Sequence, residues 1–120
     1  MDTPKIFDSE LKFCEILWQH QPVKSSELVH LCADQLGWKK STTYTVIKRL
    51  TDRGVVKTED ATVTALVGRE DVQRAESRAF VQRNFSGSLP GFLNAFVGGK
   101  GLTAAEADEL RRMIDTFEEE

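Results

Sequence analysis

The sequence contains little cysteine, histidine or proline, with two, two and three of these residues among 120. Cys14 and Cys32 lie among apolar residues at helical spacing, which is typical of buried structural thiols. The sequence has no paired-cysteine spacing of the kind that binds zinc, so a metal site would have to recruit His20 or His30. We therefore expect no disulfide, no metal and no cofactor.

Long apolar runs are also missing. No run approaches the roughly 20 residues that cross a bilayer, and the N-terminal MDTPKIFDSELK lacks the apolar stretch of a signal peptide. With 40% hydrophobic and 29% charged residues, the composition is that of a globular protein with a buried core. We expect a cytoplasmic protein that does not bind membranes.

Motifs typical of enzymes are absent as well. The sequence has no Gly-x-Ser-x-Gly, no His-Glu-x-x-His and no Gly-x-x-x-x-Gly-Lys-Ser/Thr. The glycine-rich segment 98–101 follows a predicted helix, whereas a nucleotide-binding loop would follow a strand, so this segment is predicted to be a linker. We do not expect an enzyme, and no catalytic residue is proposed.

The charges are distributed unevenly along the chain. The net charge of −3 argues by itself against a nucleic-acid partner. Segment 39–57, however, has six Lys or Arg residues and one Asp, whereas segment 103–120 has two Arg and seven acidic residues. An acidic chain with one concentrated basic segment can still bind a phosphate backbone through that segment.

The first half of the sequence predicts three helices and a hairpin. Apolar residues recur at helical spacing in segments 7–22, 25–37 and 39–54. Asp8 or Ser9 is the expected N-cap of the first helix, and Gly37 is the expected left-handed end of the second. Segment 55–67 alternates around a polar centre, as two short strands joined by a turn do. This order predicts a winged helix-turn-helix domain over residues 1–67.

The second half predicts helices over 69–85, 89–97 and 103–117, the last beginning with a Thr103–Glu106 capping box. These short helices carry more bulky apolar groups than they can bury alone, and burial of each is worth roughly 1.5–3 kcal/mol. We expect residues 68–120 to form a helical dimerisation domain; the alternative is that they pack back onto the first domain. The expected interface residues are Phe80, Phe85, Leu89, Phe92, Leu93, Phe96, Leu110, Ile114 and Phe117.

The third helix has the residue pattern of a DNA-reading helix. Val46, Ile47 and Leu50 form an apolar face that can attach it to its domain, while the opposite face carries short polar groups and cations. Ser and Thr are only middling helix formers, so their repetition here favours a function over a solvated helix face, which is the alternative. The expected DNA-binding residues are Lys39, Lys40, Ser41, Thr42, Tyr44, Thr45, Lys48 and Arg49.

The order and spacing of four blocks resemble the penicillinase-repressor family, which includes regulators of β-lactamase and methicillin resistance and copper-responsive repressors. The blocks are SELKFCEILW, GWKKSTTYTVIKRLTDRGVV, LVGREDVQRAESRAFVQRNFSGSLPGFLNAFV and GLTAAEADELRRMID. The resemblance implies a homodimer whose N-terminal winged helices bind a palindromic operator in double-stranded DNA. It also implies that Ser41, Thr42, Tyr44 and Thr45 read bases.

The sequence departs from this family at three places. Glu59 and Asp60 stand where the family's hairpin has a basic, glycine-containing tip, so a weak wing contact is expected. The bond corresponding to the family's Asn-Phe cleavage site is Ala95-Phe96, and the chain ends in Glu118-Glu119-Glu120, where copper-responsive members have a cysteine-rich tail. Control by that protease and copper sensing are therefore not expected, and no motif identifies another inactivating protease or an inducer.

The main alternative to a repressor is a winged-helix module that binds another protein and has no specific DNA affinity. The acidic net charge and the weak wing favour this alternative. It predicts no salt-dependent DNA affinity, and it predicts that Lys40, Lys48 and Arg49 can be replaced without effect on partner binding.

Overall fold

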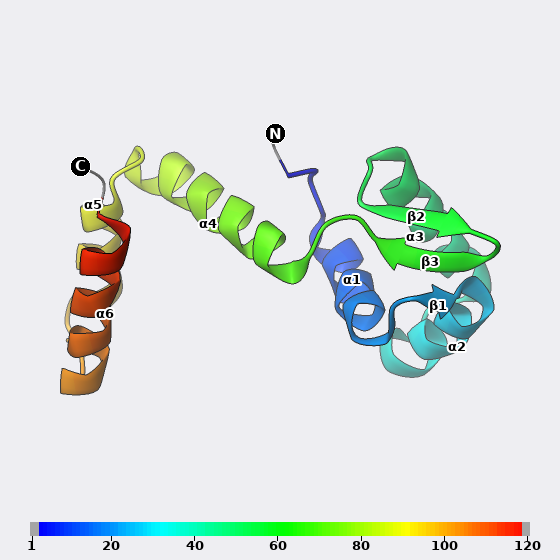
Figure 1. Ribbon diagram of the computed structural model, residues 1–120, viewed down its shortest axis with the longest axis horizontal. Helices are drawn as coiled ribbons and strands as arrows, with labels where there is room; N and C mark the ends of the chain where they lie inside the picture. Colours follow the sequence, from blue (N-terminus) through cyan, green and yellow to red (C-terminus); the bar gives the residue numbers. More distant parts are fainter. Residues whose placement is uncertain (1–2, 119–120) are drawn as a thin grey trace. The chain divides into compact units, whose positions relative to one another are not determined.

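The computed structural model describes residues 3–118 and is mainly helical, with one small antiparallel sheet, as predicted (Figure 1). Glu119 and Glu120, which contribute to the acidic C-terminal segment, lie outside the described residues. The elements in chain order are α1 (Asp8–His20), β1 (Val23–Lys24), α2 (Ser25–Leu36), α3 (Lys40–Asp52), β2 (Val56–Glu59), β3 (Thr62–Ala65), α4 (Arg69–Phe85), α5 (Leu89–Val97) and α6 (Ala104–Phe117).

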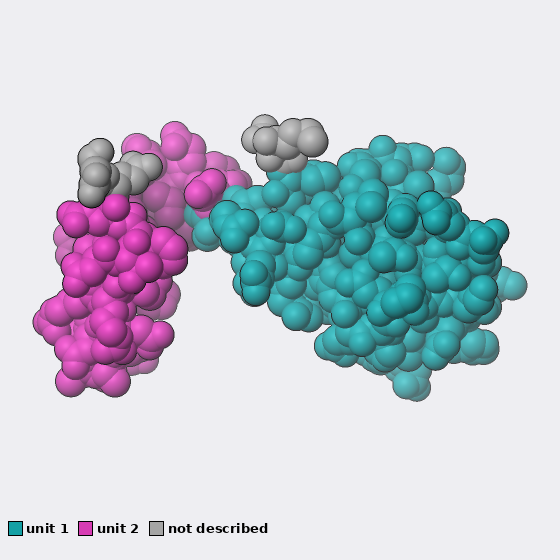
Figure 2. Space-filling view, viewed as in Figure 1, with its two compact units in different colours: residues 1–77 teal, residues 78–120 magenta. Residues whose placement is uncertain are grey.

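The chain divides into two compact units, residues 1–77 and 78–120 (Figure 2). The first unit contains α1 to β3 and the beginning of α4, and the second contains the rest of α4 with α5 and α6. The division between the two compact units falls inside α4. It does not test the domain boundary expected after residue 67, which stays a prediction. None of the described helices is both long enough and apolar enough to span a membrane.

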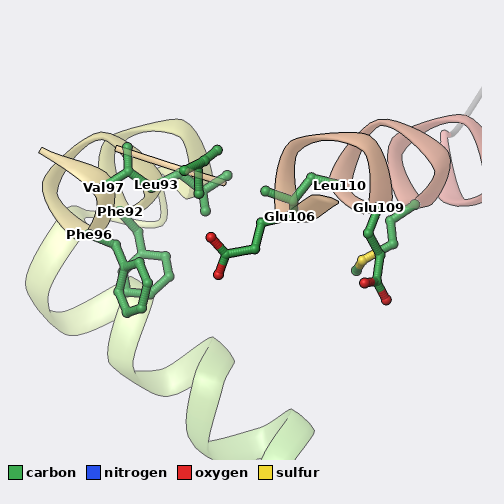
Figure 3. A pocket seen from close by; sticks show the side chains of 9 residues that line it. Phe92, Leu93, Phe96, Val97, Glu106, Glu109 and Leu110 are labelled. Carbon is green, nitrogen blue, oxygen red and sulfur yellow. The ribbon is translucent and has the colours of Figure 1, made fainter. Parts of the chain in front are cut away.

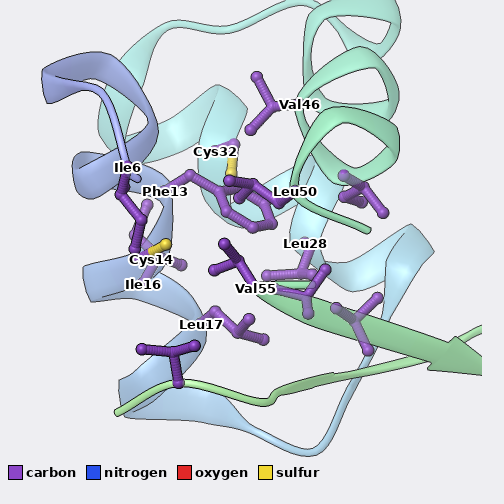
Figure 4. Packing of buried hydrophobic residues seen from close by; sticks show 14 of the residues in the cluster. Ile6, Phe13, Cys14, Ile16, Leu17, Leu28, Cys32, Val46, Leu50 and Val55 are labelled. Carbon is purple, nitrogen blue, oxygen red and sulfur yellow. The ribbon is translucent and has the colours of Figure 1, made fainter. Parts of the chain in front are cut away.

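The first unit has a dense apolar core (Figure 4). Helix α1 contributes Phe13 and Leu17, and Leu28 of α2 and Leu50 of α3 pack against them with no exposed surface. Each of these residues lies on the apolar face that helical spacing predicts. The remaining core side chains are Ile6, Cys14, Ile16, Val23, Cys32, Val46, Ile47, Val55, Val56, Val63, Val67 and Val72.

The N-terminal end of α1 differs from the prediction. Phe7 is the N-cap of α1, and its N–H donates to Glu10 Oε1 at 3.0 Å; neither Asp8 nor Ser9 caps the helix. The helix thus begins at Asp8 with Phe7 as its N-cap, and Glu10 satisfies the free Phe7 N–H from inside the first turn. At the C-terminal end of α2, Gly37 adopts φ 68° and ends the helix in the left-handed conformation, as predicted.

The sheet has the strand order β1-β3-β2. The hairpin of β2 and β3 was predicted, whereas β1 was not, because two residues are too few to show alternation. Val23 pairs with Val63, and Lys24 pairs with Thr62. The hairpin turn consists of Asp60 and Ala61, both with positive φ, the backbone required by a two-residue turn of type I′.

The second unit has no buried core of its own among residues 78–118. Helix α4 ends at Phe85, and Ser86 and Gly87, which follow it, adopt φ 50° and 81°. The predicted capping box of α6 is present: Thr103 Oγ1 accepts the Glu106 N–H at 3.1 Å, and Glu106 Oε1 accepts the Thr103 N–H at 3.0 Å. The helices therefore form by local signals, while most of their apolar side chains remain exposed.

Candidate nucleic-acid interface

Helix α3 separates its side chains into a buried and an exposed face. Thr43, Val46, Ile47 and Leu50 are buried in the first unit. All eight residues expected to bind DNA are exposed, namely Lys39, Lys40, Ser41, Thr42, Tyr44, Thr45, Lys48 and Arg49. The two sets alternate because the apolar positions recur every three or four residues, which is one face of a helix. The exposed face therefore combines hydroxyl groups with cations.

Thr43 is the one polar residue on the buried face of α3. It has no exposed surface, and its Oγ1 lies 3.5 Å from the Lys39 carbonyl oxygen at the start of the helix. Cys32 of α2 lies beside it; burial raises the pKa of the Cys32 thiol, and a hydrogen bond with Thr43 opposes this shift. The contact packs α2 closely against α3, so the exposed face of α3 is presented on a fixed support.

The turn between α2 and α3 places the first two lysines. The Gly37 N–H donates to the Ala33 carbonyl at 3.1 Å, and the Trp38 N–H donates to the Cys32 carbonyl at 3.3 Å. The Trp38 ring lies parallel to that of Phe13, with centroids 6.3 Å apart. This stacking fixes Trp38 against the core, so Lys39 and Lys40 follow it at the exposed N-terminal end of α3.

Lys48 forms a weak ion pair on the exposed face of α3. Its Nζ lies 3.4 Å from Asp52 Oδ2, and the two side chains are 79% and 64% exposed. Pairs in such exposed positions contribute little and are screened by salt. The ammonium group can therefore leave Asp52 for a phosphate at small cost.

Arg53 is one of the six cations of segment 39–57, but it does not lie on the exposed face of α3. It donates to the carboxylate of Glu10, which is only 4% exposed, and to the Lys5 carbonyl at 2.8 Å. Its guanidinium also lies 5.2 Å from the centre of the Phe7 ring. Arg53 thus connects the C-terminal end of α3 to α1 and to the segment before it.

The environment of Glu10 lowers the pKa of its carboxyl group. Burial alone raises this pKa, but hydrogen bonds from Arg53 and the Phe7 N–H, with the charges of Arg53 and Arg49, outweigh that effect. Sequence analysis missed the pair, although a signal was present: Glu10 precedes Phe13 and Cys14 by three and four residues, on the apolar face of α1. A carboxylate at a core position needs a cationic partner.

A second group of contacts attaches the beginning of α4 to α1. Arg69 donates to both carboxylate oxygens of Glu15, with Nη2 2.6 Å from Oε2, and lies 5.3 Å from the centre of the Trp18 ring. The hydrogen bond from Arg69 lowers the pKa of Glu15. Trp18 Nε1 donates to the Val67 carbonyl at 2.9 Å. Nothing in the local pattern of either helix predicted these contacts, because both partners lie on exposed faces.

The residues expected at a dimer interface all lie in the second unit. The rings of Phe80, Phe85, Phe92 and Phe96 form one cluster, with successive centroids 5.5–6.1 Å apart. Phe96, Ile114 and Phe117 are 73%, 62% and 75% exposed. Leu93 and Leu110 both line a pocket between α5 and α6, and Leu89 is exposed at the start of α5.

A pocket of about 310 Å³ lies between α5 and α6 within the second unit (Figure 3). Apolar side chains of α5 form one wall, and the opposite wall combines Leu110 with the carboxylates of Glu106 and Glu109. Its lining is Phe92, Leu93, Phe96, Val97, Leu102, Glu106, Glu109, Leu110 and Met113. The pocket therefore continues the exposed apolar surface of this unit.

The two thiols are buried and unpaired, as expected. Burial, together with the nearby charges of Glu10 and Glu15, raises the pKa of Cys14 to about 12, so this thiol stays protonated. His20 is exposed, and its Nδ1 lies 2.8 Å from the Ile16 carbonyl oxygen. Within residues 3–118, no three His, Cys, Asp or Glu side chains converge in a way that could hold a metal ion.

Comparison with known proteins gives a consistent family match. The sequence model described as "Penicillinase repressor" matches residues 6–116. The penicillinase repressor of Bacillus licheniformis is 22% identical over 116 residues, which cover 93% of this chain and 91% of that protein. The methicillin resistance regulatory protein MecI of Staphylococcus aureus is 24% identical over 117 residues, which cover 94% and 95%.

A solved structure shares the fold. The solution structure of the Bacillus licheniformis BlaI monomeric form, in complex with the blaP half-operator, superposes with a TM-score of 0.52 at 24% identity. The match covers 59% of this chain and 93% of that one. The three helices and the hairpin therefore have the fold of that solved structure.

Proposed function

The chain belongs to the penicillinase repressor family, and from this we propose that it is a transcriptional repressor that binds a palindromic operator as a homodimer. The observation that carries the proposal is the exposed face of α3, where hydroxyl groups and cations lie together on a helix attached by its apolar face. A helix of this kind can enter the major groove of DNA with its polar face toward the bases.

The exposed residues of α3 divide into two roles. Ser41, Thr42 and Thr45 are short enough to approach base edges, through hydroxyl hydrogen bonds or through a threonine methyl against a thymine methyl. Lys40, Lys48 and Arg49 have the reach and the charge to bind phosphates, and Tyr44 can reach a phosphate or a sugar. Lys39 adds a further cation at the N-terminal end of the helix.

Exposure of the second unit supports dimerisation. In a monomer the apolar cluster and the pocket are exposed to water. Contact with a second copy would remove this apolar surface from water, which is favourable. A two-fold symmetric dimer presents two copies of α3 to DNA, which predicts half-sites about one helical turn apart, or a multiple of this distance.

A repressor acts by binding DNA, and no chemical step is required of this chain. The family consists of repressors, and we propose no catalytic activity. A bacterial operator lies in the cytoplasm, which is where we place the protein. Release from the operator would then depend on a signal that weakens dimerisation or DNA binding.

The test is selection of bound sites from a random duplex library, followed by titration of the selected site at two salt concentrations. We expect a two-fold symmetric site that binds one dimer, with an affinity that falls steeply as salt increases. If a folded dimer enriched no site, the proposal would be wrong, and protein–protein contact would become the better explanation of the winged helix.

A further inference from the structure

The hairpin of β2 and β3 carries the carboxylates Glu59 and Asp60 near its tip, which would repel a phosphate backbone. The structure adds a third strand beside this tip. Lys24 of β1 pairs with Thr62, which in turn pairs with Glu59. A cation from a segment far away in the sequence therefore lies next to the acidic turn.

The register of the sheet decides which way Lys24 faces. Val23 pairs with Val63, and both are buried, so this row of the sheet faces the core. Faces alternate along a strand, so the neighbouring row of Lys24, Thr62 and Glu59 faces away from the core. Lys57 and Thr64 form the next outward-facing row. The outer face of the sheet thus carries two lysines, two threonines and one glutamate.

The glutamate on this face forms an exposed ion pair with the second lysine. Lys57 Nζ lies 3.8 Å from Glu59 Oε1, whereas Lys24 forms no ion pair among the described residues. Lys24 Nζ instead donates to the Asp60 carbonyl oxygen at 3.3 Å. An ammonium group has three donors, so two remain available to a ligand. The Ser25 N–H also donates to the Ala61 carbonyl at 2.8 Å, which holds the turn beside β1.

The sheet is attached to the end of α3. The Val55 N–H donates to the Leu50 carbonyl at 2.8 Å, and the Leu66 N–H donates to the Val55 carbonyl at 2.8 Å. When α3 occupies a groove, the sheet is therefore held beside it and moves with it. Phosphates that border this groove are the anions that such a surface meets.

We propose that Lys24 supplies the wing with its contact to the DNA phosphate backbone, a role that the hairpin's own acidic tip does not fill. Thr62 lies beside it on the outer face, and its hydroxyl donates to the same Asp60 carbonyl at 3.4 Å. This inference rests on the proposed DNA-binding function. It adds a DNA-binding residue outside α3, which would contribute to the affinity for DNA of any sequence and not to base preference.

The test compares Lys24→Ala and Lys24→Gln with the wild-type protein on a fluorescently labelled duplex of mixed sequence. Glutamine keeps a polar N–H donor and removes the charge, and the Ser25–Ala61 backbone bond holds the turn in both variants. We expect both variants to lower the slope of log affinity against log salt by about 0.9, the value for one phosphate contact. Between about 50 and 200 mM salt, each variant would then lose three- to fourfold less affinity than wild type.

Lys100→Ala is the matched control, because Lys100 is an exposed lysine in the second unit. We expect the slope of Lys100→Ala to equal that of wild type and Lys24→Arg to restore it. An unchanged slope for both Lys24 variants, even with a lower affinity, would overturn the proposal and leave Lys24 only its attachment to the turn. Equal effects of Lys100→Ala and Lys24→Ala would also overturn it, because net charge would then explain both.

Failure of this inference can be distinguished from failure of the proposed function. If wild type showed no salt-dependent affinity for any duplex, DNA binding itself would be wrong. If wild type bound and Lys48→Ala lowered the slope while the Lys24 variants did not, only the wing contact would be wrong.

Discussion

Glu10 places a carboxylate in the core of the first unit, where hydrogen bonds from Arg53 and the Phe7 N–H compensate for its burial. Removal of one partner from a buried ion pair costs more than the pair contributes, because a charge is left without compensation. The residue before α1, Phe7, and the residue after α3, Arg53, are held together by this arrangement. The Glu10 side chain therefore connects α1 to the C-terminal end of α3.

We predict that Arg53→Met lowers the free energy of unfolding at neutral pH by about 3 kcal/mol. Without Arg53, burial would raise the pKa of Glu10 above its usual 4.5. Glu10 would then become protonated in the folded variant as the pH falls, which removes the buried charge. The difference in free energy of unfolding between the variant and wild type should therefore become smaller. Urea unfolding at pH 7 and pH 4 measures both effects. Arg74→Met, which breaks an exposed pair with Asp71, should change stability by less than about 1 kcal/mol.

The same pair predicts acid sensitivity of the wild-type protein. Because the pKa of Glu10 is lowered in the folded state, its contribution is complete above the unfolded value of 4.5 and is lost as pH falls through the folded value. We expect stability to decrease below about pH 4.5, and Glu10→Gln to flatten this decrease. An equally steep decrease in Glu10→Gln would assign it to other carboxylates.

Ala61 is a second residue whose environment predicts a measurable effect. It adopts φ 59° in the hairpin turn, where a side chain costs roughly 1–2 kcal/mol and glycine avoids this cost. Glycine also increases the entropy of the unfolded chain, which offsets part of this gain. The net effect of Ala61→Gly should be to raise the free energy of unfolding by about 0.5–1 kcal/mol. The control is Ala33→Gly in α2, an exposed helical position where glycine should lower stability by about as much. Destabilisation by both would contradict the turn geometry.

On helix α3, we expect different residues to determine the sequence preference and the salt dependence of DNA binding. Thr45 and Lys48 are neighbours on its exposed face, one with a short side chain and one with a long cationic side chain. This face is independent of the core, so substitutions on it can change binding without changing the fold.

We predict that Thr45→Ala relaxes sequence preference, because it removes a hydroxyl and a methyl from the bases. Lys48→Ala should weaken binding to all sequences similarly and lower the salt slope by about 1, because it removes one phosphate contact. Titration of the selected operator and of point-substituted operators at two salt concentrations measures both quantities. The opposite pattern, with Lys48 setting preference and Thr45 setting the slope, would reverse the two assignments.

Whole-molecule behaviour depends on the second unit, where no residue between 78 and 118 is buried within one chain. Short helices with exposed phenylalanines are marginal alone, because most helical stability in proteins comes from packing of an apolar face. A second copy is the partner that we propose for this face.

We predict that Phe96→Ala converts the dimer to monomer at low micromolar concentration. Loss of a ring that becomes buried is worth roughly 3 kcal/mol, which is more than a hundredfold in Kd. The isolated chain should keep its helices, because Phe96 is 73% exposed there. Analytical ultracentrifugation measures the dimer, and Asn94→Ala, an exposed neighbour on α5, is the control that should remain dimeric. A fully dimeric Phe96→Ala would move the interface away from this residue.

Local patterns of the sequence were sufficient for the helices and for the exposed face of α3. The helix over 69–85 has the predicted bounds, and the Thr103–Glu106 capping box has the predicted bonds. These features involve residues within a few positions of each other, so apolar periodicity and capping chemistry determine them. The same holds for Thr45 and Lys48, whose exposure follows from the helical period of Val46, Ile47 and Leu50.

Tertiary structure alone decided which distant residues meet. Strand β1, the Glu10–Arg53 pair and the position of Lys24 beside Asp60 join residues 36 or more positions apart. Arg53 and Lys24 each carry one positive charge, yet the fold pairs Arg53 with a buried carboxylate and leaves Lys24 on the outer face of the sheet. Charge in the sequence is a property of a residue, whereas its availability to DNA depends on the partner that folding places next to it.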